Sequence, residues 1–188
     1  MINKNKFLTI VAITFSLSNA AIASDEIHGG DPEAGKALAA DCGACHGNDG
    51  NSATPMFPKL AGLGEKYMVK QLRDMVAKKR NVPQMIGPLE GKSDKDLQDL
   101  AAYFNSQTMQ LSGAKEAKVL TNSGIKVDSL ALGARIYRAG NSEVGTPACS
   151  GCHSPRGLGN DAAGFPRLGG QHAKYIAAQL RNFRAGKR

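Results

Sequence analysis

Two short stretches of this sequence place paired thiols and an imidazole close together. Residues 42–46 read Cys-Gly-Ala-Cys-His, and residues 149–153 read Cys-Ser-Gly-Cys-His. This spacing is typical of covalent haem attachment, because the two thiols reach the vinyl groups on one porphyrin edge and the next imidazole then lies beneath the iron. We therefore expect two covalently bound haem c groups. Their thiols and axial histidines are Cys42, Cys45 and His46 in the first motif, and Cys149, Cys152 and His153 in the second.

The four cysteines also allow other chemistry. They could form two disulfides in an oxidising compartment, a thioredoxin-like dithiol or a four-cysteine zinc site. A zinc ribbon separates its cysteine pairs by roughly 15 to 20 residues, whereas the gap here runs from Cys45 to Cys149. None of these alternatives requires a histidine after both pairs, so haem attachment is the favoured interpretation.

The first iron needs a donor on its other face. A methionine thioether there raises the reduction potential relative to a second histidine. Met85 lies in a Pro- and Gly-broken segment, 81–91, which is expected to be a loop that can direct a side chain at a metal. We expect Met85 to be this ligand; the alternative is an ordinary half-buried loop methionine. Four other methionines are less suited by position, in a predicted core, the attachment loop or the linker: Met56, Met68, Met75 and Met109.

Other candidate residues surround the motifs. Pro58 and Pro166 follow the motif histidines by 12 and 13 residues. A backbone carbonyl at either position could accept the N–H of the imidazole and orient it, and a plain loop proline is the alternative. His28 is expected to be solvated. His172 has no equivalent histidine in the other half of the chain, and is expected at the surface or at a helix start.

The N-terminus has the features of a secretory signal peptide. Lys4 and Lys6 precede an apolar run over 7–17, and Ala21-Ile22-Ala23 offers a cleavage site. We expect residues 1–23 to be removed and the mature protein to reside in the periplasm. The apolar run is too short to span a bilayer; an uncleaved signal that serves as an anchor is the alternative.

Charge is distributed unevenly along the chain, whose formal net charge is +8. Residues 24–110 carry 10 basic and 12 acidic side chains, and residues 111–188 carry 12 and 4, so the two parts have net charges of −2 and +8. The absence of a basic run interleaved with aromatic residues argues against nucleic-acid binding. The asymmetry predicts a dipolar molecule whose basic part docks on acidic partners.

Helices are expected to deliver the motifs. Asp31 and Ser93 have the position of N-caps before helical apolar spacing, and Asp128 or Ser129 does the same in the second half. The segment 106–127 loses periodicity and is expected to be a linker. The expected helices run from 31 into 42, over 64–80, over 93–104 and over 128–137.

The chain contains an internal repeat. About half of the positions from 57 to 80 are identical to those 108 residues further on, and Arg80 pairs with Arg188. We expect two copies of one haem domain, 24–105 and 128–188, joined by the linker. Residues 81–104 have no counterpart in the second copy up to Arg188, so its iron is expected to be five-coordinate or water-bound.

The paired motifs, the phrases at 57–62 and 164–172, and the sequence at 100–104 together resemble the cytochrome c4 family. The resemblance implies an all-α fold of two tandem class I cytochrome c domains with facing haem propionate edges, the second domain being C-terminally incomplete. It implies His/Met ligation of both irons, with Met85 as the sixth ligand in the first domain. Nothing in the sequence outside the haem motifs looks catalytic, so we expect an electron carrier rather than an enzyme, and we expect it to be a monomer. The implied function is to carry single electrons from membrane quinol-oxidising complexes to terminal oxidases or reductases. Such a carrier can also associate peripherally with the membrane. Two alternatives are a dihaem peroxidase-like enzyme with an open iron at His153 and an electron-entry subunit of a larger dehydrogenase.

Overall fold

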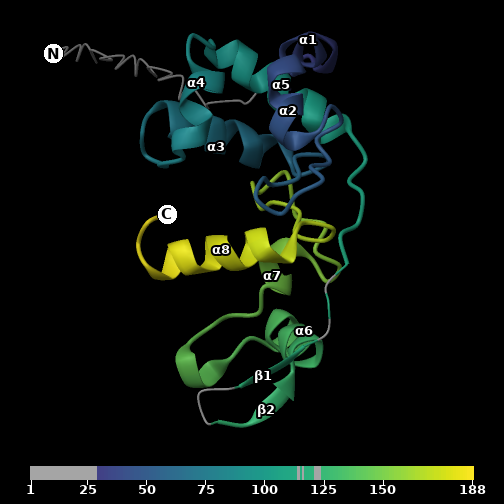
Figure 1. Cartoon of the computed structure of the whole chain (residues 1–188), viewed down its shortest axis with the longest axis vertical. Coiled ribbons are helices and arrows are strands. Elements are labelled where there is room, and N and C mark those ends of the chain that lie inside the picture. Colours follow the sequence, from purple (N-terminus) through teal and green to yellow (C-terminus); the bar gives the residue numbers. More distant parts are fainter. Residues whose placement is uncertain (1–28, 114, 116, 121–123) are drawn as a thin grey trace, which may run out of the picture.

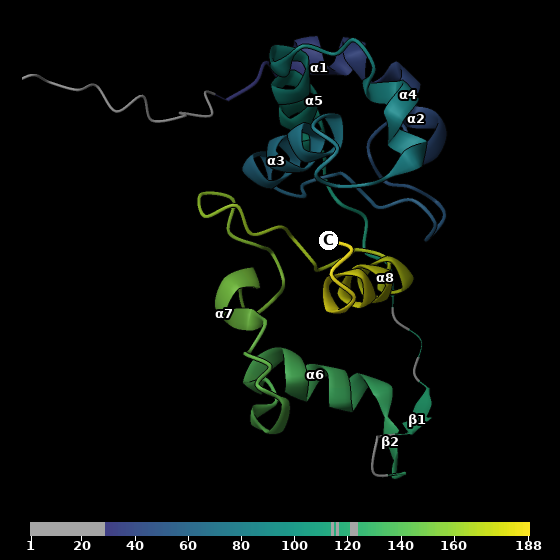
Figure 2. The ribbon, with the colours of Figure 1, turned by 90° about the vertical axis from the view of Figure 1, so that its left-hand side faces the viewer.

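The structure is a computed structural model that describes residues 29–113, 115, 117–120 and 124–188. Two lobes lie one above the other along the longest axis of the molecule (Figure 1). Helices α1 to α5 form the first lobe, while α6 to α8 and a small sheet form the second (Figure 2). The expected signal peptide and the expected solvation of His28 lie outside the described residues.

The first lobe is helical. Two of its helices begin where the sequence predicts N-caps: Asp31 accepts from the N–H groups of Glu33 and Ala34, and Ser93 forms a capping box with Asp96. These caps supply partners for backbone donors that the first turn cannot satisfy. The elements are α1 (Pro32–Leu38), α2 (Ala40–His46), α3 (Glu65–Val76), the 3₁₀ turn η1 (Pro83–Met85), α4 (Ile86–Leu89) and α5 (Asp94–Ser106).

Helix α5 is the centre of the first lobe, since α1 and α3 both pack against it. The core is one cluster of small and apolar side chains from these helices and their connections: Ala39, Ala61, Leu63, Met68, Val69, Leu100, Ala101, Phe104 and Met109. Met109 lies beyond α5 and is only 4% exposed. The expected linker therefore contributes to the core of the first lobe.

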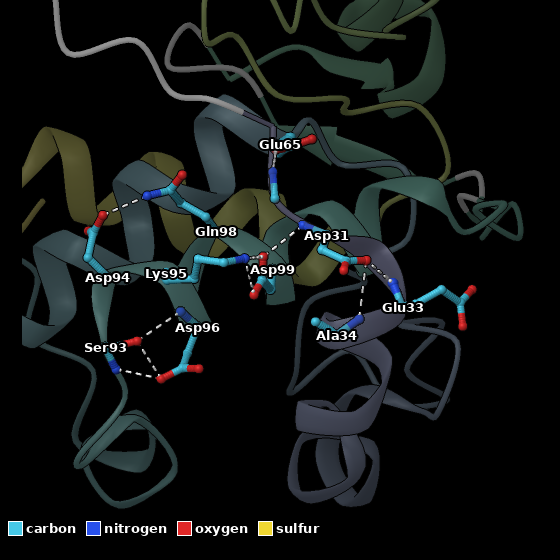
Figure 3. Close-up of polar contacts among 11 residues, drawn as sticks. Asp31, Glu33, Ala34, Glu65, Ser93, Asp94, Lys95, Asp96, Gln98 and Asp99 are labelled. Atoms are coloured by element: carbon cyan, nitrogen blue, oxygen red, sulfur yellow. Dashed lines mark hydrogen bonds and ion pairs between the residues drawn. The ribbon is translucent and has the colours of Figure 1, made fainter.

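Polar contacts fix the start of α1 on α5 (Figure 3). The Asp99 carboxylate accepts from the N–H of Asp31 at 2.7 Å and from Lys95 Nζ at 2.8 Å. The N–H of Gly30 donates to Glu65 at the start of α3 over 2.9 Å. These bonds hold the segment that leads into the first motif against the other two helices of the core.

The second lobe begins with a hairpin. Strands β1 (Lys118–Leu120) and β2 (Lys126–Asp128) are antiparallel, with Val119 opposite Val127. Asp128 then caps α6 by accepting from the N–H of Ala131, as the sequence predicts. The remaining elements are α6 (Ser129–Ala139), the 3₁₀ turn η2 (Ser142–Val144), α7 (Ser150–His153) and α8 (Ala173–Arg184).

Several local predictions were wrong. The fold class was predicted correctly as mainly helical, but the segment expected to be a linker contains β1 and β2; strands of three residues are too short to show an alternating pattern. The expected loop 81–91 contains η1 and α4, and Pro83 occupies the first position of η1, which its fixed φ favours. Helix α3 ends at Val76, and Lys78 follows with a φ of 56°. In the described part of the chain, no helix is long and apolar enough to cross a membrane.

Candidate haem-binding sites

The first Cys-x-x-Cys-His motif lies in α2, and its histidine is enclosed. His46 is 5% exposed, and its Nδ1 lies 2.8 Å from the carbonyl oxygen of Pro58. The Phe57 ring approaches the imidazole edge-on, with 6.0 Å between ring centroids. Because a carbonyl oxygen only accepts, this contact places the proton on Nδ1 and leaves Nε2 free to bind a metal.

Burial sets the protonation of these groups. It lowers the pKa of His46, an effect that the hydrogen bond to Pro58 partly offsets. Burial also raises the pKa of the Cys42 thiol, with Lys92 opposing and Asp41 reinforcing the shift. A neutral imidazole is the form that coordinates a metal, so the lowered pKa favours the form of His46 that can bind iron.

A cavity of about 550 Å³ opens beside this motif. Cys42, Cys45, His46 and Met85 all line it, so the structure brings together the attachment residues and the methionine expected on the opposite face. The volume lies in the range of cofactor pockets, roughly 300–1,000 Å³. Thiols, an imidazole and a thioether around one such space fit a covalently attached haem.

Other methionines also line this cavity. Met68 is 4% exposed and belongs to the core cluster, while Met56 is 77% exposed. Met75, on α3, is half-buried. Met109 is not among the lining residues and packs in the core. Met85 differs from all of them because it ends a 3₁₀ turn outside the long helices.

The second motif repeats the geometry of the first. His153, in α7, has its Nδ1 2.8 Å from the carbonyl oxygen of Pro166. The Phe165 ring lies edge-on to it at 6.0 Å and 68°, against 66° for the first pair. Two motifs 107 positions apart therefore hold their imidazoles through the same two partners.

Tyr137 is a contact of the second motif that sequence reasoning missed. Its hydroxyl donates to the carbonyl oxygens of Ser154, at 2.6 Å, and His153, at 3.4 Å. Burial raises its pKa, and the neighbouring Cys149 adds to the shift. Its apolar spacing on the predicted helix identified it as a packing residue and carried no sign of this role.

The cysteines do not form the alternative structures. All four are free thiols. In the described ranges, no three side chains of the His, Cys, Asp or Glu type come together as a metal cluster. The arrangement in the structure is thus two separate Cys-x-x-Cys-His sites rather than disulfides or one zinc site.

Hydrogen bonds join the two lobes near the sites. The Gln171 side chain accepts from the N–H of Lys59 at 2.9 Å and donates to the Lys59 carbonyl at 2.8 Å. His172 occupies the N-cap position of α8, as expected of a helix start. Its Nε2 also lies 3.0 Å from two oxygens of Ser52, and its Nδ1 lies 3.2 Å from Ser112. Sequence reasoning missed these contacts, for which the Gly-Gly-Gln-His phrase at 169–172 was the available signal.

Comparisons with known proteins agree with this geometry. The cytochrome c family model matches residues 32–108. Cytochrome c4 of Pseudomonas aeruginosa is 49% identical over 184 residues, which cover 98% of this chain and 84% of that protein. The crystal structure of reduced recombinant cytochrome c4 from Pseudomonas stutzeri superposes with a TM-score of 0.74 at 48% identity, covering 85% of this chain and 83% of the other. A thiosulfate dehydrogenase electron acceptor of Thiomonas intermedia is 37% identical over 151 residues, 80% of this chain and 65% of its own length.

Proposed function

This chain belongs to the cytochrome c4 family and is a dihaem electron-transfer cytochrome c rather than an enzyme, and we propose which of its residues hold the haems and which proteins exchange electrons with them. Cys42 and Cys45 attach the first haem, with His46 and Met85 as axial ligands. The second haem is attached and ligated by Cys149, Cys152 and His153.

The observation that carries this assignment is the shared environment of the two histidines. In both motifs the imidazole Nδ1 lies 2.8 Å from a proline carbonyl and a phenylalanine ring packs edge-on at 6.0 Å. A hydrogen bond of this kind orients the ring and increases its basicity as a ligand. Equal geometry in two repeats supports equal roles for His46 and His153.

The protein's own residues seat the haems, shield them and leave one edge accessible. Bound haem supplies a one-electron ferric–ferrous couple. Around the first site, His46 is buried while Cys45 is exposed, and Cys152 is exposed at the second site. The thioether edge of each haem would therefore lie at the surface, where a redox partner can approach.

We propose a periplasmic location after cleavage following Ala23, and domain limits at 24–105 and 128–188 with a linker between them. The physiological route would run from membrane quinol-oxidising complexes to terminal oxidases or reductases, with the monomer docking through the basic second part. Similarity to a thiosulfate dehydrogenase electron acceptor favours a second candidate, acceptance of electrons from a periplasmic dehydrogenase. Stopped-flow reduction by each class of donor separates the two, since the physiological donor should reduce the protein much faster.

Two measurements test the haem assignment. The intact mass of the purified protein should include two haems and lack residues 1–23. Met85→Ala should abolish the charge-transfer band between methionine sulfur and ferric iron and lower the potential of the first haem, because a thioether favours the ferrous state. Met75→Ala is the matched control, since Met75 lines the same cavity from α3, and it should retain the band. If the band survives in Met85→Ala and disappears in Met75→Ala, the axial ligand is Met75 on α3 and the assignment of Met85 is wrong.

A further inference from the structure

The residue that follows each motif histidine has the same unusual backbone conformation in both repeats. Gly47 has φ 78° and ψ 148°, and Ser154 has φ 67° and ψ 159°. Glycine adopts this region freely, whereas a residue with a Cβ is strained there and stays only where the surrounding contacts hold it. Within the described part of the chain, the residues other than glycine with a positive φ are Lys78 and Ser154. The second repeat therefore has a strained serine directly after His153, where the first repeat has a glycine.

The hydroxyl of Tyr137 holds this serine in place. It donates to the carbonyl oxygen of Ser154 at 2.6 Å and lies 3.4 Å from the carbonyl oxygen of His153. Tyr137 is a half-buried residue of α6. The Ser154 hydroxyl is also bonded, since its Oγ accepts from the N–H of Leu158 at 2.9 Å. The side chain and the carbonyl of the strained residue are thus both fixed by hydrogen bonds.

The turn that begins at Ser154 connects this bond to the imidazole. The N–H of Gly157 donates to the Ser154 carbonyl at 3.1 Å, and the Gly157 carbonyl accepts at 2.8 Å from two successive N–H groups of the segment 166–169. The same segment contains the Pro166 carbonyl, which lies 2.8 Å from Nδ1 of His153. A displacement of the Ser154 carbonyl would therefore disturb both the backbone next to the histidine and the acceptor that orients its ring.

The first repeat has the same turn but holds it from a different helix. The N–H of Gly50 donates to the Gly47 carbonyl at 2.9 Å. A tyrosine hydroxyl again bonds the segment after the histidine, but it belongs to Tyr103 of α5 and donates to the carbonyl of Asn48 at 2.8 Å. In the described part of the second repeat, Tyr137 of α6 supplies the tyrosine hydroxyl instead. Such a bond after both motifs points to a shared role in holding the histidine.

We propose that Tyr137 is a positioning residue for the second haem, because its bond to Ser154 fixes the orientation of the His153 imidazole. The inference rests on the haem ligation proposed above. A hydrogen bond from the ring N–H to the Pro166 carbonyl makes the imidazole a stronger donor to iron, which stabilises the ferric state. Without the Tyr137 hydroxyl, Ser154 relaxes, the bond to Pro166 weakens and the potential of the second haem rises.

Potentiometric titration of Tyr137→Phe tests the proposal. The second haem is the one whose potential Met85→Ala does not shift, and in Tyr137→Phe its potential should be higher than in the wild type. The nuclear magnetic resonance shifts of its haem methyl groups in the ferric protein should change as well, because they depend on the orientation of the axial imidazole plane. Tyr103→Phe is the matched control, since it removes the corresponding hydroxyl from the first repeat and should change neither property of the second haem. An unchanged or lower potential in Tyr137→Phe, unchanged methyl shifts, or an equal effect of Tyr103→Phe on the second haem would overturn the proposal.

Ser154→Gly separates a positioning role from a general loss of stability. Glycine adopts the conformation of residue 154 without strain, as Gly47 does in the first repeat, so the Tyr137 hydroxyl is needed less. The rise in potential caused by Tyr137→Phe should therefore be smaller in the Ser154→Gly background, and a rise of equal size contradicts the proposal. If Tyr137→Phe is isolated with fewer than two haems, the double variant should regain the second haem, and its failure to do so would also overturn the proposal. The intact mass of the wild type reports attachment at Cys149 and Cys152 separately, so an error in the attachment sites is distinguishable from an error in the role of Tyr137.

Discussion

Replacing Gly35 by alanine should weaken the first lobe at the crossing of α1 and α5. Gly35 is buried in α1. A Cβ at this position would lie 1.9 Å from the carbonyl oxygen of Asp99, 2.4 Å from the carbonyl carbon of Asp99 and 2.9 Å from the Cβ of Tyr103. Two of these atoms are backbone of α5, which cannot rotate away as a side chain can. The helices must therefore separate, and α1 leads directly into the helix that carries the first motif.

The size of the effect follows from two opposing contributions. Overpacking a core costs about 1–3 kcal/mol, and contact with backbone places Gly35→Ala toward the upper end. Alanine gains up to about 1 kcal/mol over glycine in a helix interior. A net destabilisation of about 2 kcal/mol remains, which corresponds to a fall of roughly 10 °C in Tm for a lobe of this size.

Gly133 provides the matched control for this substitution. It lies inside α6, and apart from its chain neighbours and the backbone of its own helix, no heavy atom of the described residues comes within 4 Å of a Cβ placed there. Gly133→Ala should therefore keep only the propensity gain and stabilise its lobe by up to about 1 kcal/mol. Differential scanning calorimetry and far-ultraviolet circular dichroism melts of the haem-loaded proteins measure both variants. A Gly35→Ala protein as stable as wild type, or a loss of the same size in Gly133→Ala, would refute the close-approach argument.

Three further predictions concern α5 and the charged surfaces. Asp99→Ala should lower the free energy of unfolding measured by urea titration by about 1–3 kcal/mol, because the N–H of Asp31 loses its acceptor. Asp99→Asn keeps an oxygen acceptor and should lower it less. Equal losses of stability in the two variants would contradict a role for this hydrogen bond. Stability should fall below about pH 4, because hydrogen bonds from Arg73, Ser93 and Lys95 lower the pKa values of Asp94, Asp96 and Asp99 respectively, and these carboxylates favour folding only while they are ionised; a Tm that does not change between about pH 4.5 and about pH 2.5 would contradict this. Reduction by an acidic redox partner should slow as ionic strength rises, given the +8 charge of residues 111–188, and stopped-flow rates that are unchanged across a salt series would argue against electrostatic docking.

The short-range features of this protein could be predicted from the sequence because they depend on neighbouring residues. A Cys-x-x-Cys-His motif brings its own thiols and imidazole together whatever the fold around it. The caps at Asp31, Ser93 and Asp128 act on backbone groups two or three positions away, and the structure confirms all three. The internal repeat was visible as identity at a fixed offset, and the family membership that it suggested is confirmed by the comparisons.

Helices and strands that are too short to show helical or alternating spacing of apolar residues were predicted poorly. η1 and α4 together span only residues 83–89, and each strand of the hairpin has three residues, so neither helical nor alternating spacing could be recognised. Met85 was selected because it lies between two predicted helices. Its location in one cavity with His46 is a property of the packed lobe, and its role as a ligand stays a prediction.

Contacts between distant parts of the chain were decided by the tertiary structure alone. The bond from Lys59 to Gln171 spans 112 positions, and the bonds between Arg80 or Arg188 and the opposite repeat span 95 to 121. The internal repeat places Arg80 and Arg188 at corresponding positions, but it does not show that their side chains share hydrogen-bond partners. These contacts depend on how the two lobes pack, because hydrogen bonds require separations of about 3 Å, which only a fixed arrangement of α3 and α8 provides.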